Sequence, residues 1–192
     1  MGFAERFPRW TSAVLAIIQL ALTVVIIGLE IKSIFIDLAH GTIWVGFWAS
    51  LIFIKTLVMM LFITCCCRGR CCATYVLAWN IFSGILACVT IYFDRTFIND
   101  PCKCYLGDKL CCAVRSVDSF RTNYTSILNT CIDAIATNNK GELQWCSTGS
   151  PPYNKVQYLK AQLGCAVGML ISCALYVVIY IFACLGICFG HD

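Results

Sequence analysis

Four long apolar segments constrain this chain more than any other feature of its sequence. They run from about residues 10 to 30, 43 to 64, 73 to 93 and 163 to 189. A helix needs roughly 20 apolar residues to cross the hydrocarbon core of a bilayer, so each segment is long enough. Charged residues make up only 12% of the chain, about half the share expected of a soluble domain. The sequence therefore predicts an all-α membrane protein, a bundle of four transmembrane helices that forms one domain over residues 1–192.

The charges in the short links predict the direction of these spans. Arg6 and Arg9 precede the first span, and two more arginines lie in the link at residues 65–72. Because arginine and lysine are retained on the cytosolic side of a membrane, we expect both termini and this link in the cytosol. The long link at about 96–158 then faces outward as an extracellular subdomain. We expect a multi-pass protein of the plasma membrane or an endomembrane.

The outward link carries features of an oxidising compartment. Its Asn-Tyr-Thr sequence is an acceptor for N-glycosylation at Asn123. Its even number of cysteines predicts disulfides, although the sequence alone selects no pairing. Apolar residues at three- and four-residue steps predict that the loop is partly helical. This stapled loop either shields the bundle or binds a partner. The six cysteines are Cys102, Cys104, Cys111, Cys112, Cys131 and Cys146.

The link between the second and third spans reads CCCRGRCC. Cysteines in the cytosol stay reduced, and three adjacent cysteines fit poorly with the spaced pairs of a zinc site. Juxtamembrane cysteines beside basic residues are typical of S-palmitoylation. The alternatives are small apolar side chains without a further role, or a metal or redox site. The candidate acylation sites are Cys65, Cys66, Cys67, Cys71 and Cys72.

Polar residues also occur inside the predicted spans. Lys55 lies near the middle of the second span, where a lysine is costly and usually faces a protein interior or a water cavity. Asn80 and Ser83 on the third span are its candidate neighbours. Three roles stay open for Lys55: a hydrogen-bonded or snorkelling structural lysine, a docking point for an acidic residue in another protein's span, or ion conduction.

Small residues recur at every fourth position in the last span. Gly164, Gly168 and Ser172 form this series. Such spacing lets helices approach closely. It predicts a packing seam, either within the bundle or between two copies of the chain.

Two short motifs resemble a known family. The first span contains LAIIQL at residues 15–20, and the second span begins within GTIWVGFW at residues 41–48. They are similar to the Leu-Gly-x-Ile-Gln and Gly-x-x-x-Trp-Gly-Gly patterns of the membrane-spanning four-domains subfamily A, the B-lymphocyte antigen family. The resemblance covers about residues 12–95, and Val45-Gly46 departs from the second pattern. It implies a tetraspan organiser that dimerises and modulates receptors or channels.

Tetraspanins and sarcospan-like proteins are the alternative resemblance. The outward loop of tetraspanins carries a Cys-Cys-Gly signature, and this chain reads Cys111-Cys112-Ala113 there. The link around residues 37–42 is also shorter than the small outer loop of tetraspanins.

These features favour a membrane organiser or adaptor that associates with itself, with membrane lipids and with receptor or channel partners. The alternative is an oligomeric ion channel or transporter subunit that uses Lys55. We expect no enzyme and no catalytic residues, since the chain lacks the Cys-x-x-Cys pair of thiol oxidoreductases. The two histidines are far apart in the sequence, so we expect neither a metal site nor a cofactor. Scattered basic residues predict no nucleic-acid partner.

Overall fold

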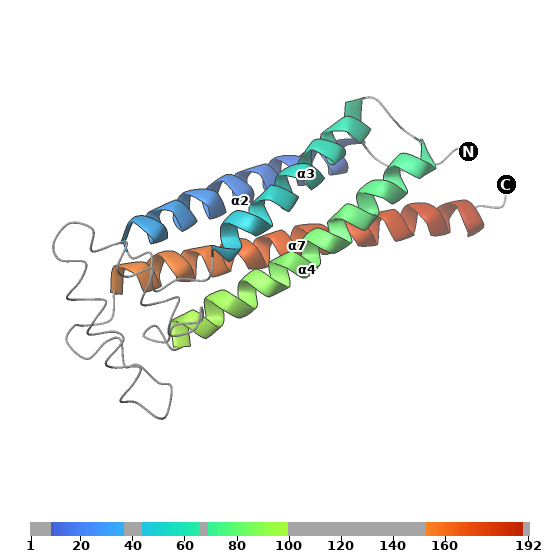
Figure 1. Ribbon diagram of the computed structural model, residues 1–192. Helices are drawn as coiled ribbons and strands as arrows, with labels where there is room; N and C mark the ends of the chain where they lie inside the picture. Colours follow the sequence, from blue (N-terminus) through green and yellow to red (C-terminus); the bar gives the residue numbers. More distant parts are fainter. Residues whose placement is uncertain (1–8, 37–43, 66–68, 100–152, 190–192) are drawn as a thin grey trace, which may run out of the picture.

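The described part of the computed structural model comprises residues 9–36, 44–65, 69–99 and 153–189, and it forms four helices (Figure 1). They are α2 (Arg9–Ile36), α3 (Val45–Cys65), α4 (Arg70–Asn99) and α7 (Tyr153–Phe189). All four are long and apolar enough to cross a membrane. The predicted all-α architecture, with four helices long and apolar enough to span a membrane, is therefore confirmed for the described residues.

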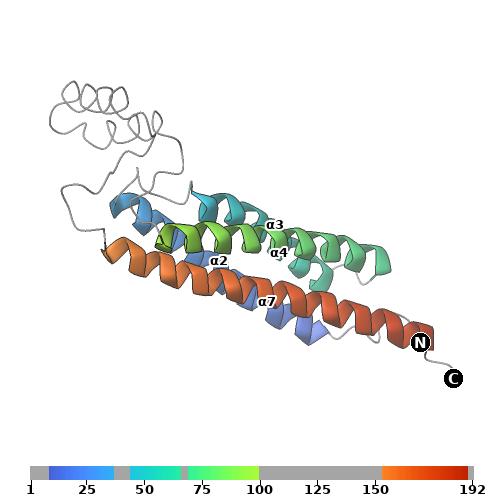
Figure 2. The same cartoon turned by 90° about the horizontal axis from the view of Figure 1, so that it is seen from below.

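The helices form a closed four-membered ring. α2 packs against α3 and α7, and α4 packs against the same two helices. Consecutive helices run in opposite directions, so the start of α2 and the end of α7 lie at the same end of the bundle as the link between α3 and α4 (Figures 1 and 2). We call this the proximal end, and the end where α2 finishes and α7 starts the distal end.

The buried side of each helix repeats at alternating three- and four-residue steps. In α7, for example, Lys155, Leu159, Gln162, Ala166 and Met169 are all buried. This is the heptad spacing of left-handed helix bundles, in which side chains of one helix fill holes in the next. The same spacing occurs in α4, with buried Ala73, Val76, Asn80, Ser83, Ala87, Thr90, Asp94 and Phe97.

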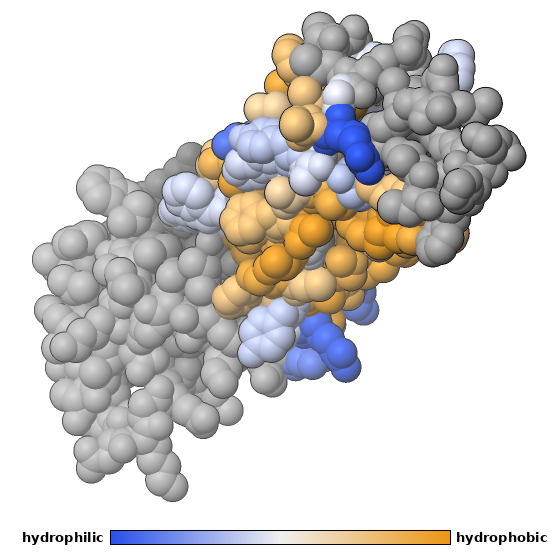
Figure 3. Space-filling view, turned by 90° about the vertical axis from the view of Figure 1, so that its right-hand side faces the viewer, coloured by the Kyte–Doolittle hydropathy of each residue, from blue (hydrophilic) through white to orange (hydrophobic). Residues whose placement is uncertain are grey.

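The bundle has an unusually polar interior and an apolar exterior. Large apolar side chains are exposed along all four helices, and an apolar surface crosses the described part of the face seen in Figure 3. Lipid solvates such a surface, and polar groups in a membrane protein are confined to the bundle interior. The buried polar and charged residues are Ser12, Gln19, Thr23, Glu30, Ser33, Ser50, Thr56, Asn80, Ser83, Thr90, Asp94, Lys155, Gln162 and Ser172.

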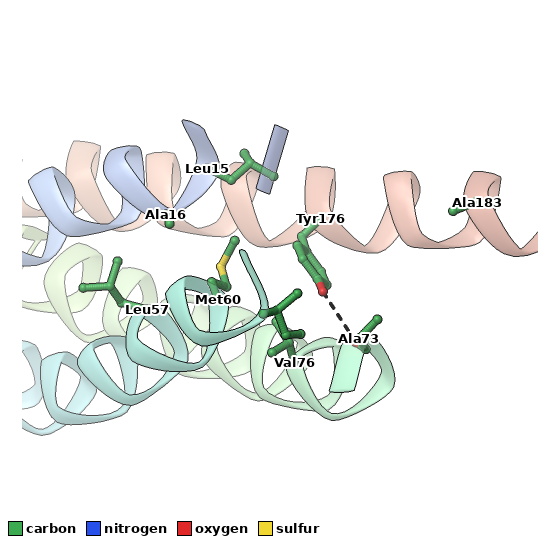
Figure 4. Close-up of a cluster of buried hydrophobic side chains, with 9 residues drawn as sticks. Leu15, Ala16, Leu57, Met60, Ala73, Val76, Tyr176 and Ala183 are labelled. Atoms are coloured by element: carbon green, nitrogen blue, oxygen red, sulfur yellow. Dashed lines mark hydrogen bonds between the residues drawn. The ribbon is translucent and has the colours of Figure 1, made fainter. Parts of the chain in front are cut away.

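Two apolar clusters divide the interior along its length. The proximal cluster (Figure 4) includes Met60, Val76 and Tyr176, whose hydroxyl lies 3.5 Å from the carbonyl oxygen of Ala73. The distal cluster comprises Ile26, Ala49, Phe53, Ala87, Met169 and Cys173. Polar side chains lie between the two clusters and again beyond the distal one, and these two polar layers are described below.

α3 begins at the distal end with an uncommon backbone conformation. Trp44 has a φ of 54°, in the left-handed region that non-glycine residues rarely adopt. Its carbonyl oxygen accepts bonds from the backbone nitrogens of Phe47 and Trp48 at 3.0 and 3.2 Å. This start places Gly46 in the first turn of α3, facing the interior.

The helices extend beyond the predicted spans at the distal end. α7 begins at Tyr153 rather than near residue 163, and α4 continues to Asn99 rather than ending near residue 93. The apolar segment starts later than α7 does because the first turns of the helix contain lysines and glutamines. The expected stapled loop, with Cys102, Cys104, Cys111, Cys112, Cys131, Cys146 and Asn123, lies outside the described residues.

Candidate functional site

One polar layer at the distal end joins all four helices. We call it the acid layer, and it consists of Glu30 on α2, Gly46 on α3, Asp94 on α4 and Gln162 on α7. The Nε2 atom of Gln162 donates to Glu30 Oε2 at 2.8 Å and to Asp94 Oδ1 at 3.4 Å. Glu30 is 2% exposed, and Asp94 and Gln162 are 0% exposed. Two carboxylates from different helices therefore converge on a single neutral amide.

Gly46 leaves the space that the acid layer occupies. A Cβ atom at this position would lie 2.7 Å from Gln162 Nε2 and 2.7 Å from Glu30 Oε2. Both distances are far below van der Waals contact, so any side chain at residue 46 would displace one of the two polar groups. The absence of a side chain on α3 is what allows Glu30 and Gln162 to meet.

Two buried oxygen atoms of the acid layer have no hydrogen-bond partner. They are Asp94 Oδ2 and Gln162 Oε1. A buried acceptor without a donor costs about 1–3 kcal/mol, and more when it is charged. Lys155, nearer the start of α7, is also buried, and its Nζ lies 5.6 Å from the centre of the Phe97 ring.

A second polar layer, which we call the middle layer, lies between the two apolar clusters. Gln19 Nε2 donates to Asn80 Oδ1 at 3.1 Å and lies 3.7 Å from Cys173 Sγ. Asn80 Nδ2 in turn donates to the carbonyl oxygen of Val76 at 3.0 Å. The layer ties α2, α4 and α7 together by side-chain hydrogen bonds.

The same layer continues to α3 through two hydroxyl groups. Thr56 and Ser83 share a hydrogen bond of 2.7 Å between their Oγ atoms. The Thr56 hydroxyl also lies 3.4 Å from the carbonyl oxygen of Trp79. Asn80 and Ser83, which the sequence indicates as polar groups within the membrane, are thus both buried and hydrogen-bonded.

Lys55 does not join the middle layer, so Asn80 and Ser83 are not its partners. It is exposed on the outer side of α3, and its Nζ lies 3.8 Å from the centre of the Trp79 ring. Successive residues on a helix point about 100° apart, so the inward direction of Thr56 turns Lys55 outward. The lysine is a charge on the lipid-facing surface, partly stabilised by an aromatic ring.

The small residues of α7 divide between two environments. Gly168 packs against α2, where a Cβ would lie 3.3 Å from a methyl group of Leu22. Ser172 is buried. Gly164 is exposed, and a Cβ there would meet nothing within 4 Å. The series thus follows the α2–α7 contact at Gly168 and leaves it at Gly164.

The cysteines between α3 and α4 are described only in part. Cys71 is exposed in the first turn of α4, and Cys72 beside it is half-buried. Cys65 is the last residue of α3, whereas Cys66 and Cys67 lie outside the described residues. In the described ranges, no group of three or more histidine, cysteine, aspartate or glutamate residues could hold a metal ion.

The acid layer is the feature that reading the sequence misses. Glu30 and Asp94 lie near the ends of the predicted spans, and Gln162 precedes the predicted start of the fourth, so none of them attracts attention. The signal that could have found them is the heptad register. Counting in steps of three and four from Gln19 leads to Glu30, and counting from Asn80 leads to Asp94.

The helices and their polar layers define a multi-pass membrane protein built as a four-helix bundle. Comparison of the chain with family models, with curated proteins and with solved structures finds no match.

Proposed function

We propose that this protein is a membrane organiser that binds the transmembrane helices of other proteins laterally. The observation that carries this proposal is the outward position of Lys55 at the middle of α3. Lys55 lies about 14 Å along the helix axis from either end of the span. A lysine side chain reaches only several ångströms toward an interface, so snorkelling does not bring its charge to water.

The energetic cost of this position favours a partner. A lysine at the centre of a membrane helix costs about 2.5–3.5 kcal/mol on insertion scales. A cation–π contact such as the one with Trp79 returns about 0.5–2 kcal/mol. A carboxylate in a partner's span would offset the rest and become neutralised itself. The partner we propose is therefore a membrane protein with an acidic residue near the middle of a span.

The surroundings of Lys55 suit a packed helix. Tyr75, Trp79 and Phe82 on α4 form edge-to-face pairs with ring centres 6.2 and 6.0 Å apart. Leu51 and Val58 on α3 are exposed one turn on either side of the lysine. A partner helix would thus meet one charge flanked by apolar and aromatic side chains, which supports both specificity and packing.

The test compares Lys55→Met with Lys55→Arg by proximity labelling and co-purification from intact cells. Methionine keeps much of the side-chain volume and removes the charge, whereas arginine keeps the charge. We expect Lys55→Met to lower recovery of the specific membrane partners about tenfold, the effect of losing roughly 1.4 kcal/mol, and Lys55→Arg to retain them. Partner sets that are the same in all three proteins and no richer than bulk membrane would refute the organiser function.

The alternative function is that of an oligomeric ion channel or transporter subunit. Because Lys55 faces away from the bundle interior, it could line a pore only between copies of the chain. Ion flux into liposomes that contain the purified protein distinguishes this function. A flux whose anion preference reverses in Lys55→Glu would support the channel and contradict the organiser.

Several further features belong to the proposed organiser. We propose that both termini are cytosolic, in the plasma membrane or an endomembrane, and that the 65–72 link is palmitoylated. The exposure of Cys71 at the start of α4 supports acylation. The link between α4 and α7 would then face outward, carry disulfides and a glycan at Asn123, and contribute with the spans to partner binding and homo-oligomers.

A further inference from the structure

Three helices expose a basic side chain at the same level, just distal to the acid layer. The hydrogen bonds of Gln162 join α2, α4 and α7 at the level of the acid layer. Lys32 lies two residues distal to this level on α2, Arg95 one residue on α4, and Lys160 two residues on α7. At about 1.5 Å per residue, their backbone positions lie within about 3 Å of the acid layer along the bundle axis. All three side chains are exposed, and we call them the distal ring.

The charges of the distal ring point away from the carboxylates of the acid layer. Glu30 and Asp94 are the only acidic residues in the described ranges, and they are 2% and 0% exposed. Successive residues on a helix point about 100° apart, so a residue one or two positions from an inward-facing one faces outward. On α3, Trp44 lies two residues distal to Gly46 and is 45% exposed. The outer surface at this level thus carries the three basic side chains and one tryptophan.

A second level of exposed basic and aromatic side chains lies one membrane thickness away, at the proximal end. Arg70 is exposed and lies about 37 Å from Arg95 along α4. Trp10 is 82% exposed and lies about 33 Å from Lys32 along α2. The hydrocarbon core of a bilayer is about 30 Å thick, and the bilayer with its headgroups about 40–45 Å, so both separations match the distance between two headgroup regions. Between the two levels, Lys55 is the only exposed charged side chain of the described residues.

We propose that the distal ring of Lys32, Arg95 and Lys160 binds the phosphate groups of phospholipids in the leaflet at the distal end of the bundle. Phosphate is the anionic group that lies at this depth of a bilayer, and lysine and arginine bind it through charge-assisted hydrogen bonds. Trp44 lies at the same level, and tryptophan is enriched where the headgroups begin. The ring therefore meets a partner of opposite charge at the depth that the bundle dimensions indicate.

This binding fixes the depth of the bundle in the membrane. The acid layer then lies at the boundary between the hydrocarbon and the headgroups of the distal leaflet. The first turns of α7, which include the buried residues Lys155 and Leu159, lie beyond the hydrocarbon core.

The test titrates the purified full-length protein in detergent with phosphatidylglycerol, whose headgroup contains a phosphate and no cation of its own. Native mass spectrometry measures the fraction of protein that carries the lipid. Diacylglycerol with the same acyl chains is the matched lipid without a phosphate. A basic residue near an anionic lipid surface contributes a factor of about five to the affinity, so we expect phosphatidylglycerol to bind about a hundredfold more tightly than diacylglycerol. This comparison uses the unaltered chain and does not depend on any variant folding.

Variants then assign the effect to the distal ring. Lys32→Gln, Arg95→Gln and Lys160→Gln should each weaken phosphatidylglycerol binding about fivefold, and the triple variant should bind it no better than diacylglycerol. Lys55→Gln removes one exposed cation from the middle of the membrane and should leave the affinity unchanged, which makes it the matched control. The melting temperature of each sample shows that the variant is folded.

Four results would overturn the proposal. Equal affinities for phosphatidylglycerol and diacylglycerol would show that the phosphate is not recognised. Unchanged phosphatidylglycerol binding in the folded triple variant would place the phosphate elsewhere on the protein. A loss in Lys55→Gln as large as in the single ring variants would assign the effect to net charge. Displacement of the lipid by an equal concentration of soluble glycerol 3-phosphate would show that the ring binds free phosphate compounds rather than lipid.

Discussion

At the scale of single residues, Gly46 determines whether the acid layer can form. Its missing side chain is replaced by the amide of Gln162 and the carboxylate of Glu30, each 2.7 Å from where a Cβ would be. Glycine lies here for close approach rather than for backbone freedom. Gly46 thus has a direct physical role in the packing of this bundle.

We expect Gly46→Ala to destabilise the protein by separating Glu30 from Gln162. Loss of a buried hydrogen bond to a charged group corresponds to about 1.5–3 kcal/mol. The measurement is the free energy of unfolding in mixed micelles. Gly28→Ala on α2 is the matched control, since a Cβ there meets nothing within 4 Å. If both variants unfold like the unaltered protein, the acid layer is not held together as described.

The hydrogen bond between Gln19 and Asn80 allows a second residue-level prediction. In a double-mutant cycle with Gln19→Leu and Asn80→Leu, we expect a coupling energy of about 0.6 kcal/mol, the average for side-chain hydrogen bonds in membrane proteins. The same unfolding measurement gives this value. The control cycle pairs Gln19→Leu with Thr90→Val. Thr90 lies on α4, as Asn80 does, but its hydroxyl donates to the carbonyl oxygen of Leu86, so the two substitutions should have additive effects.

The sequence identifies polar residues inside the membrane more readily than their neighbours. Asn80, Ser83 and Lys55 stand out in apolar segments, and the first two are indeed buried in the bundle. Which of them meet depends on helix rotation, which hydropathy does not report because the lipid-facing side is as apolar as the core. A one-residue difference, from Lys55 to Thr56, separates the outer surface from the middle layer.

At the scale of elements, α7 is longer than the apolar segment that indicates it in the sequence. It is 37 residues long, which corresponds to about 55 Å, well beyond the roughly 30 Å of a bilayer core. Its first turns contain Lys155 and Gln162 in the register that Leu159 and Ala166 continue. Periodicity finds this extension and average hydropathy does not.

We expect Leu159→Ala to destabilise the bundle by about 2 kcal/mol, the low end of the range for a leucine removed from a packed core. Leu159 is 0% exposed, whereas Leu175, further along the same helix, is 47% exposed. Leu175→Ala is therefore the control, with an expected change below about 0.5 kcal/mol. Equal effects in chemical unfolding would mean that the first turns of α7 do not pack into the bundle.

At the scale of the whole molecule, the architecture could be predicted and the interior could not. Four apolar segments of sufficient length leave few alternatives to a helical bundle, because backbone groups in lipid must be satisfied within each helix. The interior depends on which of two apolar-looking sides of each helix turns inward. The positions of buried polar residues such as Gln19 and Asp94 indicate which side of each helix faces inward.

The packing of α4 against α7 also affects which lengths of connection between these two helices the bundle can accept. Lys155 near the start of α7 reaches the ring of Phe97 near the end of α4, so the chain leaves the bundle and re-enters it at neighbouring points. Closing a longer or shorter connection between fixed, adjacent points changes the entropy only slowly with its length. Connections of different length between these two points would therefore close at a similar entropic cost.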